Sequence, residues 1–212
     1  MGKESLRSGE FEVRIIGDPA EVATWIDSQV SPMDHSPFTA VPLLQLRKCT
    51  LFCLQTADSL VGYVAVAYVP LSALSGGDKK TTPTEGYIVS VLTVVEQRRK
   101  GIARLLLQEA IHYSAHQRCT KRMKLHALLP KCKLDGVASE SDKENRENSA
   151  TQLYTSLGFA ERRRIADYYG TGLDASELVL TDMPTEVAKE VDRKNVQSAV
   201  DRLGVKRRRE EA

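Results

Sequence analysis

Apolar and polar side chains recur along the chain with two different periods, which predict strands and helices in a mixed order. Residues 11–16, Phe-Glu-Val-Arg-Ile-Ile, alternate in the manner of a strand with one buried face. Residues 87–95 are an almost unbroken apolar run, and such a run is typical of a strand that is buried on both faces. The same reasoning predicts further strands at residues 49–56, 61–69, 123–128, 160–168 and 176–181.

Helical spacing and helix end signals occur between and after these strands. The patterns predict helices over residues 18–26, 102–116, 149–157 and 186–203. Asp18 followed by Pro19 is a capping residue with a first-turn proline, and Gly158 is a typical helix end. The last predicted helix is amphipathic, because its valines fall mostly on one face.

This order of elements predicts one α/β domain with extensions at both ends. We expect a flexible N-terminus at residues 1–10, the domain at 11–182, and an added C-terminal helix with a basic tail at 183–212. Residues 130–147 are charged and poor in apolar side chains, so they are predicted to be a mobile surface insertion. Residues 31–39 contain two prolines and are predicted to be a loop or a broken helix, and the polar residues 71–85 are predicted to be a hairpin loop.

Composition narrows the class of protein. The chain has 212 residues, 42% of them hydrophobic, which suffices for one substantial core. The net charge of +2, from 30 basic and 28 acidic residues, argues against a dedicated nucleic-acid-binding domain. No apolar run approaches the ~20 residues that a membrane-spanning helix needs.

The cysteines and the basic run bear on location. The four cysteines lack the paired spacing of metal ligands, and the N-terminus lacks a secretory apolar segment. We therefore expect reduced thiols in a soluble, cytoplasmic protein. The basic run from Lys206 to Arg209 makes the nucleus a second expected compartment, and offers a salt-sensitive contact for a phosphate-rich partner.

A cationic segment lies where the apolar strand at residues 87–95 gives way to a helix. Arg98, Arg99 and Lys100 precede Gly101, and the helical pattern follows at once. Helix N-termini bind phosphate through unpaired amides, and glycine lets the ligand approach the backbone. The segment therefore predicts a pyrophosphate site, although its glycine spacing matches neither the Walker A loop nor the dinucleotide fingerprint. An exposed turn with ordinary surface charges is the alternative interpretation.

Two motifs in order resemble the GNAT superfamily of acetyltransferases. They are Arg98-x-x-Gly101-x-Ala103 and, about fifty residues later, residues 150–159, Ala-Thr-Gln-Leu-Tyr-Thr-Ser-Leu-Gly-Phe. The resemblance implies the GNAT fold, a central mixed and mostly antiparallel sheet flanked by helices, with acetyl-CoA as co-substrate and no metal. The implied coenzyme-binding residues are Val91, Leu92, Thr93, Val94, Arg98, Arg99, Lys100, Gly101, Ile102, Ala103, Asn148 and Tyr154.

A narrower set of residues resembles the N-terminal acetyltransferases, closest to the NatE catalytic subunit. The motifs are Tyr87 opening the central strand, His126 ending the next one, and the pair Tyr168–Tyr169. The resemblance implies that Tyr87 and His126 are catalytic and handle the proton of the incoming amine. The implied substrate-binding residues are Ser31, Pro32, Met33, His35, Val89, Tyr168 and Tyr169.

The implied reaction moves the acetyl group of acetyl-CoA to protein N-terminal amines, with Met followed by an apolar residue favoured. The implied partners are NatA subunits and the ribosome. Ser31-Pro32-Met33 stands where the family has Phe-Pro-Val, so the seat for the first side chain is less hydrophobic. Glu147 stands where the family usually has an asparagine, with Asn148 beside it.

The chemistry of the residues is compatible with that reaction. An α-amine has a pKa of about 7.7–8.0, so much of it is protonated at neutral pH and a base is useful. Histidine titrates near neutrality and suits that role, whereas tyrosine more plausibly orients water or protonates a leaving thiolate. His126 could equally be a hydrogen-bonded histidine within a strand. His112 and His116 have i,i+4 spacing, but no third ligand is near in sequence, so we interpret them as surface or packing residues.

Three functions remain open at this level. The first is an N-terminal acetyltransferase of NatE type, and the second is a GNAT enzyme that acts on lysine side chains or small amines. The third is a weakly active, acetyl-CoA-binding subunit of an N-terminal acetyltransferase complex, which Ser31 favours. Preferential acetylation of Met-Leu-type N-termini over internal lysines would distinguish the NatE-type enzyme from the lysine or small-amine enzyme. Binding of acetyl-CoA without turnover would indicate the weakly active subunit.

Overall fold

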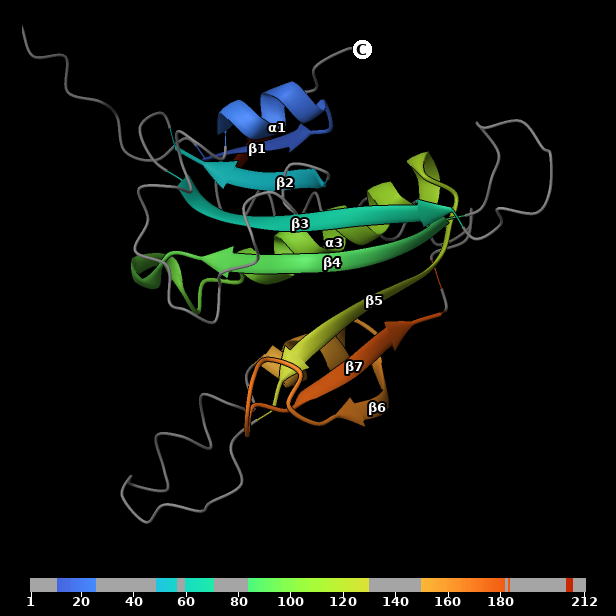
Figure 1. Ribbon diagram of the computed structural model, residues 1–212. Helices are drawn as coiled ribbons and strands as arrows, with labels where there is room; N and C mark the ends of the chain where they lie inside the picture. The colour runs from blue at the N-terminus through green and yellow to red at the C-terminus, as the bar shows by residue number, and fades with distance from the viewer. Residues whose placement is uncertain are drawn as a thin grey trace, which may run out of the picture. The chain divides into compact units, whose positions relative to one another are not determined.

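The computed structural model describes residues 11–25, 49–56, 60–70, 84–129, 150–181, 183 and 205–207. Its strands are hydrogen-bonded in the order β6-β7-β5-β4-β3-β2-β1-β8 (Figure 1). The strands are β1 (Phe11–Ile16), β2 (Thr50–Gln55), β3 (Leu60–Pro70), β4 (Thr84–Thr93), β5 (Thr120–Leu128), β6 (Ala160–Ile165), β7 (Ala175–Leu180) and β8 (Val205–Arg207). The predicted insertion at 130–147, the predicted loop at 31–39 and the predicted helix at 186–203 lie outside the described residues.

The helices follow the predicted order. They are α1 (Pro19–Trp25), the 3-10 turn η2 (Val95–Gln97) and α3 (Ile102–Gln117), and residues 150–156 are also helical. The chain forms two compact units. The first contains residues 1–67, 89–113 and 184–212, and the second contains residues 68–88 and 114–183.

Helix α1 of the first unit begins as its sequence predicts. The Asp18 carboxylate accepts hydrogen bonds from the backbone N–H groups of Ala20 and Glu21, at 2.9 and 3.0 Å. These bonds satisfy two of the amides that have no partner within a helix, so the predicted cap at Asp18 is confirmed.

Strands β1, β2 and β3 pair in antiparallel fashion and bury side chains on both faces. On one face Trp25 of α1 meets Tyr63 of β3 edge to face, with ring centroids 5.9 Å apart. On the other, Phe52 of β2 meets Tyr113 of α3 at 5.4 Å. Cys49 and Cys53 are buried on the α1 side, and burial raises the pKa of the Cys49 thiol to about 12. These two cysteines are therefore inert core residues, as their sequence context predicts.

Gly62 of β3 lies unusually close to the backbone of β4. A Cβ placed there would be 2.6 Å from the carbonyl oxygen of Leu92 and 3.3 Å from the Cα atom of Thr93. We expect Gly62→Ala to destabilise the protein by about 1–3 kcal/mol in urea unfolding, because backbone atoms cannot move aside cheaply.

Gly86→Ala is a matched control for that substitution, since the three atoms nearest to its Cβ would all be side-chain atoms, of Met123 at 3.1 and 3.5 Å and of Thr120 at 3.5 Å. Its cost should be clearly smaller than that of Gly62→Ala. Equal costs for the two variants would show that the approach of the Leu92 carbonyl is not what requires glycine at position 62.

The second unit combines parallel and antiparallel pairing. Residues 84–88 of β4 run parallel to residues 120–125 of β5, and β5 and β6 both pair antiparallel with β7. After the helix at residues 150–156, Gly158 has a φ of 90°, and Phe159 is buried against the ring of Tyr154. Gly158 thus ends the helix as predicted, because its left-handed backbone suits glycine.

Several element boundaries differ from the sequence prediction; β5, for example, begins at Thr120 and not at residue 123. Three other differences are informative. β4 begins at Thr84, so Glu85 lies in a strand and not in the predicted loop, because Arg122 and Lys124 of β5 form ion pairs with its buried carboxylate. β6 ends at Ile165 and not at residue 168, since Asp167 has a φ of 52° and turns the chain. The predicted basic tail is also partly a strand, because Val205–Arg207 pairs parallel with β1.

Candidate active site

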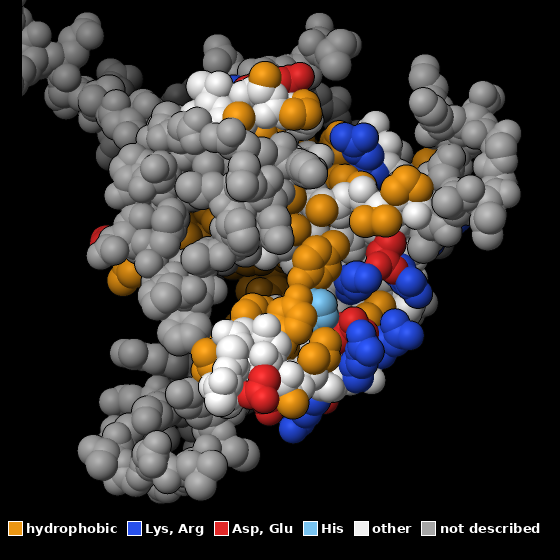
Figure 2. Space-filling view, viewed as in Figure 1, with side chains coloured by type: hydrophobic (Ala, Val, Ile, Leu, Met, Phe, Trp, Pro, Cys, Tyr) orange, Lys and Arg blue, Asp and Glu red, His pale blue; other side chains and the backbone are white. Residues whose placement is uncertain are grey.

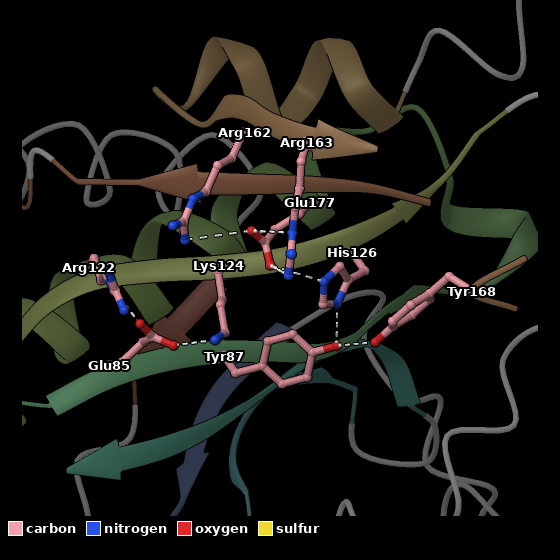
Figure 3. A network of polar contacts seen from close by, with 9 residues as sticks. All are labelled: Glu85, Tyr87, Arg122, Lys124, His126, Arg162, Arg163, Tyr168 and Glu177. Carbon is pink, nitrogen blue, oxygen red and sulfur yellow. Dashed lines mark hydrogen bonds and ion pairs between the residues drawn. The ribbon is translucent and has the colours of Figure 1, made fainter. Parts of the chain in front are cut away.

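Two of the predicted site residues, Tyr87 and His126, meet at neighbouring strands of the second unit. The Tyr87 hydroxyl lies 2.9 Å from Nδ1 of His126 and 3.2 Å from the hydroxyl of Tyr168 (Figure 3). The His126 and Tyr168 rings are also in contact, with centroids 4.3 Å apart. The predicted proton-handling pair is therefore already at hydrogen-bonding distance, within a line of three polar groups.

The turn between β6 and β7 places the tyrosine pair. Asp174 accepts a hydrogen bond from the backbone N–H of Asp167 at 2.9 Å, which closes the turn. Tyr169 donates its hydroxyl proton to the backbone carbonyl of His126, at 2.8 Å. Both Tyr168 and Tyr169 remain more than a third exposed, at 41% and 39%. The turn thus ties two accessible aromatic side chains to the end of β5.

Glu177 of β7 faces His126 from the opposite side. Its Oε2 atom lies 3.5 Å from Nε2 of the imidazole, and the side chain is only 5% exposed. Arg163 and Arg162 approach the same carboxylate, at 3.3 and 3.7 Å (Figure 3). His126 therefore has a tyrosine at one ring nitrogen and a buried carboxylate near the other.

A second carboxylate pairs with cations beside this network. Glu85 of β4 is ion-paired to both Arg122 and Lys124 of β5. Burial would raise the pKa of Glu85, but Lys124 and Arg122 together hold it below the usual value. In the space-filling view, several Lys and Arg side chains lie around a few acidic side chains, next to a histidine (Figure 2).

Burial fixes the protonation states of the central pair. It raises the pKa of Tyr87 far above the usual tyrosine value, so this hydroxyl keeps its proton. It also lowers the pKa of His126 below the ordinary histidine value of about 6.5, although Glu177 opposes the shift. At neutral pH the pair is thus a protonated phenol and a neutral imidazole, with Tyr87 placed to donate to Nδ1.

Sequence reasoning missed Glu177 and its arginine partners. Glu177 is the only charged residue of β7, Ala-Ser-Glu-Leu-Val-Leu, and its neighbours in the strand are buried. A lone carboxylate in an apolar strand requires a cationic or hydrogen-bonding partner, because burying an unpaired charge is costly. That signal was available, but it could not indicate which histidine or arginine would be the partner.

The predicted pyrophosphate loop lies in the first unit, between β4 and α3. Arg98 donates from Nε to the Thr93 carbonyl at 3.2 Å, and Lys100 donates to the Gln97 side chain at 2.7 Å. Gly101 has a φ of 82°, and a Cβ there would meet no atom of the described residues within 4 Å.

Helix α3 starts directly after this open position. Its first turn contains no acidic side chain, and its first backbone bond runs from the N–H of Leu105 to the Gly101 carbonyl, at 3.0 Å. The amides before Leu105 are thus the ones that a helix leaves for an anion. The buried Thr93 hydroxyl oxygen has no hydrogen-bond partner among the described residues. The open space at Gly101, the N-terminal amides of α3 and the exposed cations together fit a bound pyrophosphate.

The other predicted site residues have mixed outcomes. Val91, Leu92, Thr93 and Val94 are half-buried at the end of β4, and Val89 and Leu92 pack against the core cluster beneath α1. Arg99 is exposed, with a φ of 67°, while Ile102 is buried and Ala103 half-buried at the start of α3. Burial raises the pKa of Tyr154 to about 12. The predicted residues outside the described part of the chain are Ser31, Pro32, Met33, His35 and Asn148.

The described ranges contain neither a candidate membrane span nor a candidate metal site. No helix there has both the length and the apolar character to cross a bilayer. No group of three or more His, Cys, Asp or Glu side chains in the same ranges is placed to hold a metal ion. Cys119 is exposed.

The profile of the Acetyltransferase (GNAT) family matches residues 20–138, which is more than half of the chain. The protein therefore belongs to the GNAT acetyltransferase family, and the predicted α/β GNAT fold is confirmed.

One curated relative and two solved structures are similar to this chain. N-alpha-acetyltransferase 30 of Xenopus laevis is 33% identical over 95 residues, which is 45% of this chain and 29% of that relative. The chain thus spans less than a third of the length of this curated relative. Arabidopsis thaliana NAA60, solved with acetyl-CoA, has a TM-score of 0.52 and 18% identity over 81% of this chain and 99% of its own. The NatC complex bound to Gag peptide and CoA has a TM-score of 0.50 and 17% identity, over 81% of this chain and 98% of the other.

Proposed function

We propose that this acetyltransferase moves the acetyl group of acetyl-CoA to the α-amine of protein N-termini, as an enzyme of NatE type. The observation that carries the proposal is the 2.9 Å contact between the Tyr87 hydroxyl and Nδ1 of His126, beside the exposed Tyr168. The likeness to N-alpha-acetyltransferase 30, whose name states this reaction, is further support.

Acetyl-CoA is the proposed donor, held at the loop before α3. Arg98, Arg99 and Lys100 offer charge, and the first amides of α3 offer hydrogen bonds to a pyrophosphate. Structures of family neighbours that contain acetyl-CoA or CoA support this choice.

The proposed proton path uses Tyr87 and His126 in series. The substrate arrives largely as an ammonium ion, because its pKa is about 7.7–8.0. Tyr87 donates its own proton to Nδ1 of His126, so its oxygen can accept a proton from the ammonium, directly or through one water. As the ammonium loses a proton to Tyr87, the phenol passes its original proton to the imidazole.

The neutral amine then attacks the thioester carbonyl carbon. A carbon–nitrogen bond forms and the carbon–sulfur bond breaks. Of the two protons that the ammonium loses, one passes through His126 to solvent and the other ends on the departing sulfur. Tyr168 supports the path by its contact with the Tyr87 hydroxyl, at 3.2 Å.

A peptide panel tests the proposal. Free N-termini that begin Met-Leu, Met-Phe, Ala, Ser and Asp would be compared with an N-terminally blocked peptide containing one lysine. We expect the highest kcat/KM for Met followed by an apolar residue. Faster transfer to the blocked lysine peptide would favour the lysine or small-amine alternative. Acetyl-CoA binding without transfer to any peptide would indicate a weakly active subunit.

We also propose that NatA subunits and the ribosome are partners in the cytoplasm, on the basis of the family resemblance and the basic C-terminal run. Truncation after Met183 should leave acetylation of short peptides largely intact, but weaken co-sedimentation with ribosomes at low salt, because phosphate contacts depend on cationic side chains.

That truncation also removes β8, which pairs with β1. The sharper variant is therefore Arg208→Ser with Arg209→Ser, which keeps the residues of β8. We expect it to weaken sedimentation as well. Unchanged sedimentation of both variants would exclude the basic run as a ribosome contact.

A further inference from the structure

Glu177 is a buried carboxylate that the proposed proton path does not use. It lies in β7 between the buried residues Ser176 and Leu178, and its own side chain is 5% exposed. A buried carboxylate is costly unless cations or hydrogen-bond donors surround it. The groups that surround Glu177 therefore indicate which interactions its negative charge makes.

One of those groups is the imidazole of His126. Nε2 of the ring is buried and has no hydrogen-bond partner among the residues described, and Glu177 Oε2 faces it at 3.5 Å. This distance is long for a hydrogen bond but within the range of an ion pair. A proton gained by the ring would thus create a cation directly opposite a carboxylate.

The other groups are two arginines from β6. Arg163 donates to Oε2 of Glu177 at 3.3 Å, and Arg162 lies 3.7 Å from Oε1. Adjacent residues of a regular strand point to opposite faces, but the pairing of β6 with β7 shifts register between Glu161 and Arg163. This irregularity lets two consecutive arginines reach one carboxylate.

The same geometry selects one tautomer of neutral His126. The protonated Tyr87 hydroxyl can donate to Nδ1, or it can accept from an Nδ1–H group and donate to Tyr168, so this contact alone allows both tautomers. The Glu177 carboxylate faces Nε2, so its charge favours the tautomer that carries the proton on Nε2, with Nδ1 as the acceptor of the Tyr87 hydroxyl. Loss of the carboxylate would remove this preference without removing any atom of the Tyr87–His126 contact.

We propose that Glu177 is a positioning residue, whose carboxylate holds His126 in the Nε2-protonated form and stabilises the imidazolium that forms when Tyr87 passes on its proton. Arg163 and Arg162 hold the carboxylate in place and moderate its charge. The catalytic consequence rests on the proposed acetyl transfer, whereas the effect on His126 itself does not.

The charged and titratable groups around the imidazole act in opposite directions. Burial lowers the pKa of His126, Glu177 raises it, and Lys124 and Arg163 lower it further. Burial alone would raise the pKa of Glu177, but Arg163, Arg162 and His126 hold it below the usual value, so Glu177 stays charged at neutral pH. Among the described residues, the polar side chains around this part of the site come from β4, β5, β6, β7 and the β6–β7 turn, and are Glu85, Tyr87, Arg122, Lys124, Arg162, Arg163, Tyr168, Tyr169 and Glu177.

Two substitutions should therefore move the pH dependence in opposite directions. Glu177→Gln keeps the side-chain shape but removes the negative charge, so it should lower the pKa of His126 and move the acidic limb of the kcat/KM profile to lower pH. Arg163→Met removes a cation, so it should move the limb to higher pH.

The two variants should also differ in turnover. We expect Glu177→Gln to lower kcat by roughly 10- to 10³-fold, less than the ~10⁴-fold loss known where a carboxylate bonds the catalytic imidazole directly. Glu161→Gln is the matched control, because Glu161 is a β6 carboxylate that pairs with Arg164 and Ser176 and does not contact His126. Glu161→Gln should leave the acidic limb of the kcat/KM pH profile at its wild-type position.

A nuclear magnetic resonance titration of the His126 ring separates this inference from the proposed function, since it needs no turnover. The wild-type ring nitrogens should show the Nε2-protonated tautomer, and the His126 pKa should fall in Glu177→Gln and rise in Arg163→Met. Those shifts would support the role of Glu177 even if no peptide were acetylated. An unchanged His126 titration in folded Glu177→Gln, or shifts of the same sign in both variants, would overturn it.

Discussion

Tyr87→Phe and His126→Ala are each expected to lower kcat by about 10²–10⁴-fold while leaving acetyl-CoA affinity nearly unchanged. The reason is that each removes one member of a proton path whose contribution to catalysis is typically of this size. Tyr87 keeps its proton, so the hydroxyl works only together with the imidazole that it touches at 2.9 Å. Steady-state kinetics on an N-terminal peptide, with calorimetry for acetyl-CoA, would measure both effects.

The two losses should not add. Groups that act as one unit give non-additive effects, so the double variant should be about as slow as the slower single variant. Tyr68→Phe is a suitable control, because it also removes a hydroxyl bonded to another side chain, Ser114 Oγ at 2.8 Å. Wild-type turnover in His126→Ala, with the same acidic limb of the pH–rate profile, would make His126 a structural residue.

Gly101→Glu is expected to weaken acetyl-CoA binding by at least ~100-fold, or about 2.7 kcal/mol. The open space beside Gly101 is where we place the pyrophosphate, and a glutamate would fill it with bulk and negative charge. Calorimetry would give the affinity, and circular dichroism would report whether the variant is folded.

Backbone strain must be separated from that steric effect, because an L-residue with a φ near 82° costs roughly 1–2 kcal/mol by itself. Gly172→Glu is the matched control, since Gly172 has a φ of 71° and equally open surroundings, in the turn before β7. It should retain wild-type affinity for acetyl-CoA. Unchanged affinity in Gly101→Glu would place the coenzyme phosphates elsewhere.

The sequence was sufficient for the local features of the fold. The Asp18 cap, the helix end at Gly158 and the order of strands all follow from short-range patterns, and the structure has each of them. The strand ends were less predictable. Glu85 looks like a loop residue until its pairing with β5 cations is known, and the break after Ile165 depends on the turn at Asp167.

In the candidate site, too, some residues could be predicted from the sequence and others could not. Tyr87 and His126 could be predicted, because a resemblance assigned roles to them, and the structure brings them into contact. Glu177 and Arg163 could not, because their contact depends on strand register across an irregular pairing between β6 and β7. No periodic pattern in one strand states which residue of the next strand will lie opposite.

One competition experiment tests the central claim most directly. A single peptide that begins Met-Leu and carries one internal lysine would be incubated with acetyl-CoA and the enzyme, and tandem mass spectrometry would locate each acetyl group. We predict acetylation at the α-amine, with the lysine unmodified, and loss of the α-acetyl product in Tyr87→Phe. Acetylation mainly at the lysine, or an α-acetyl yield that Tyr87→Phe leaves unchanged, would contradict the proposed function and its proton path.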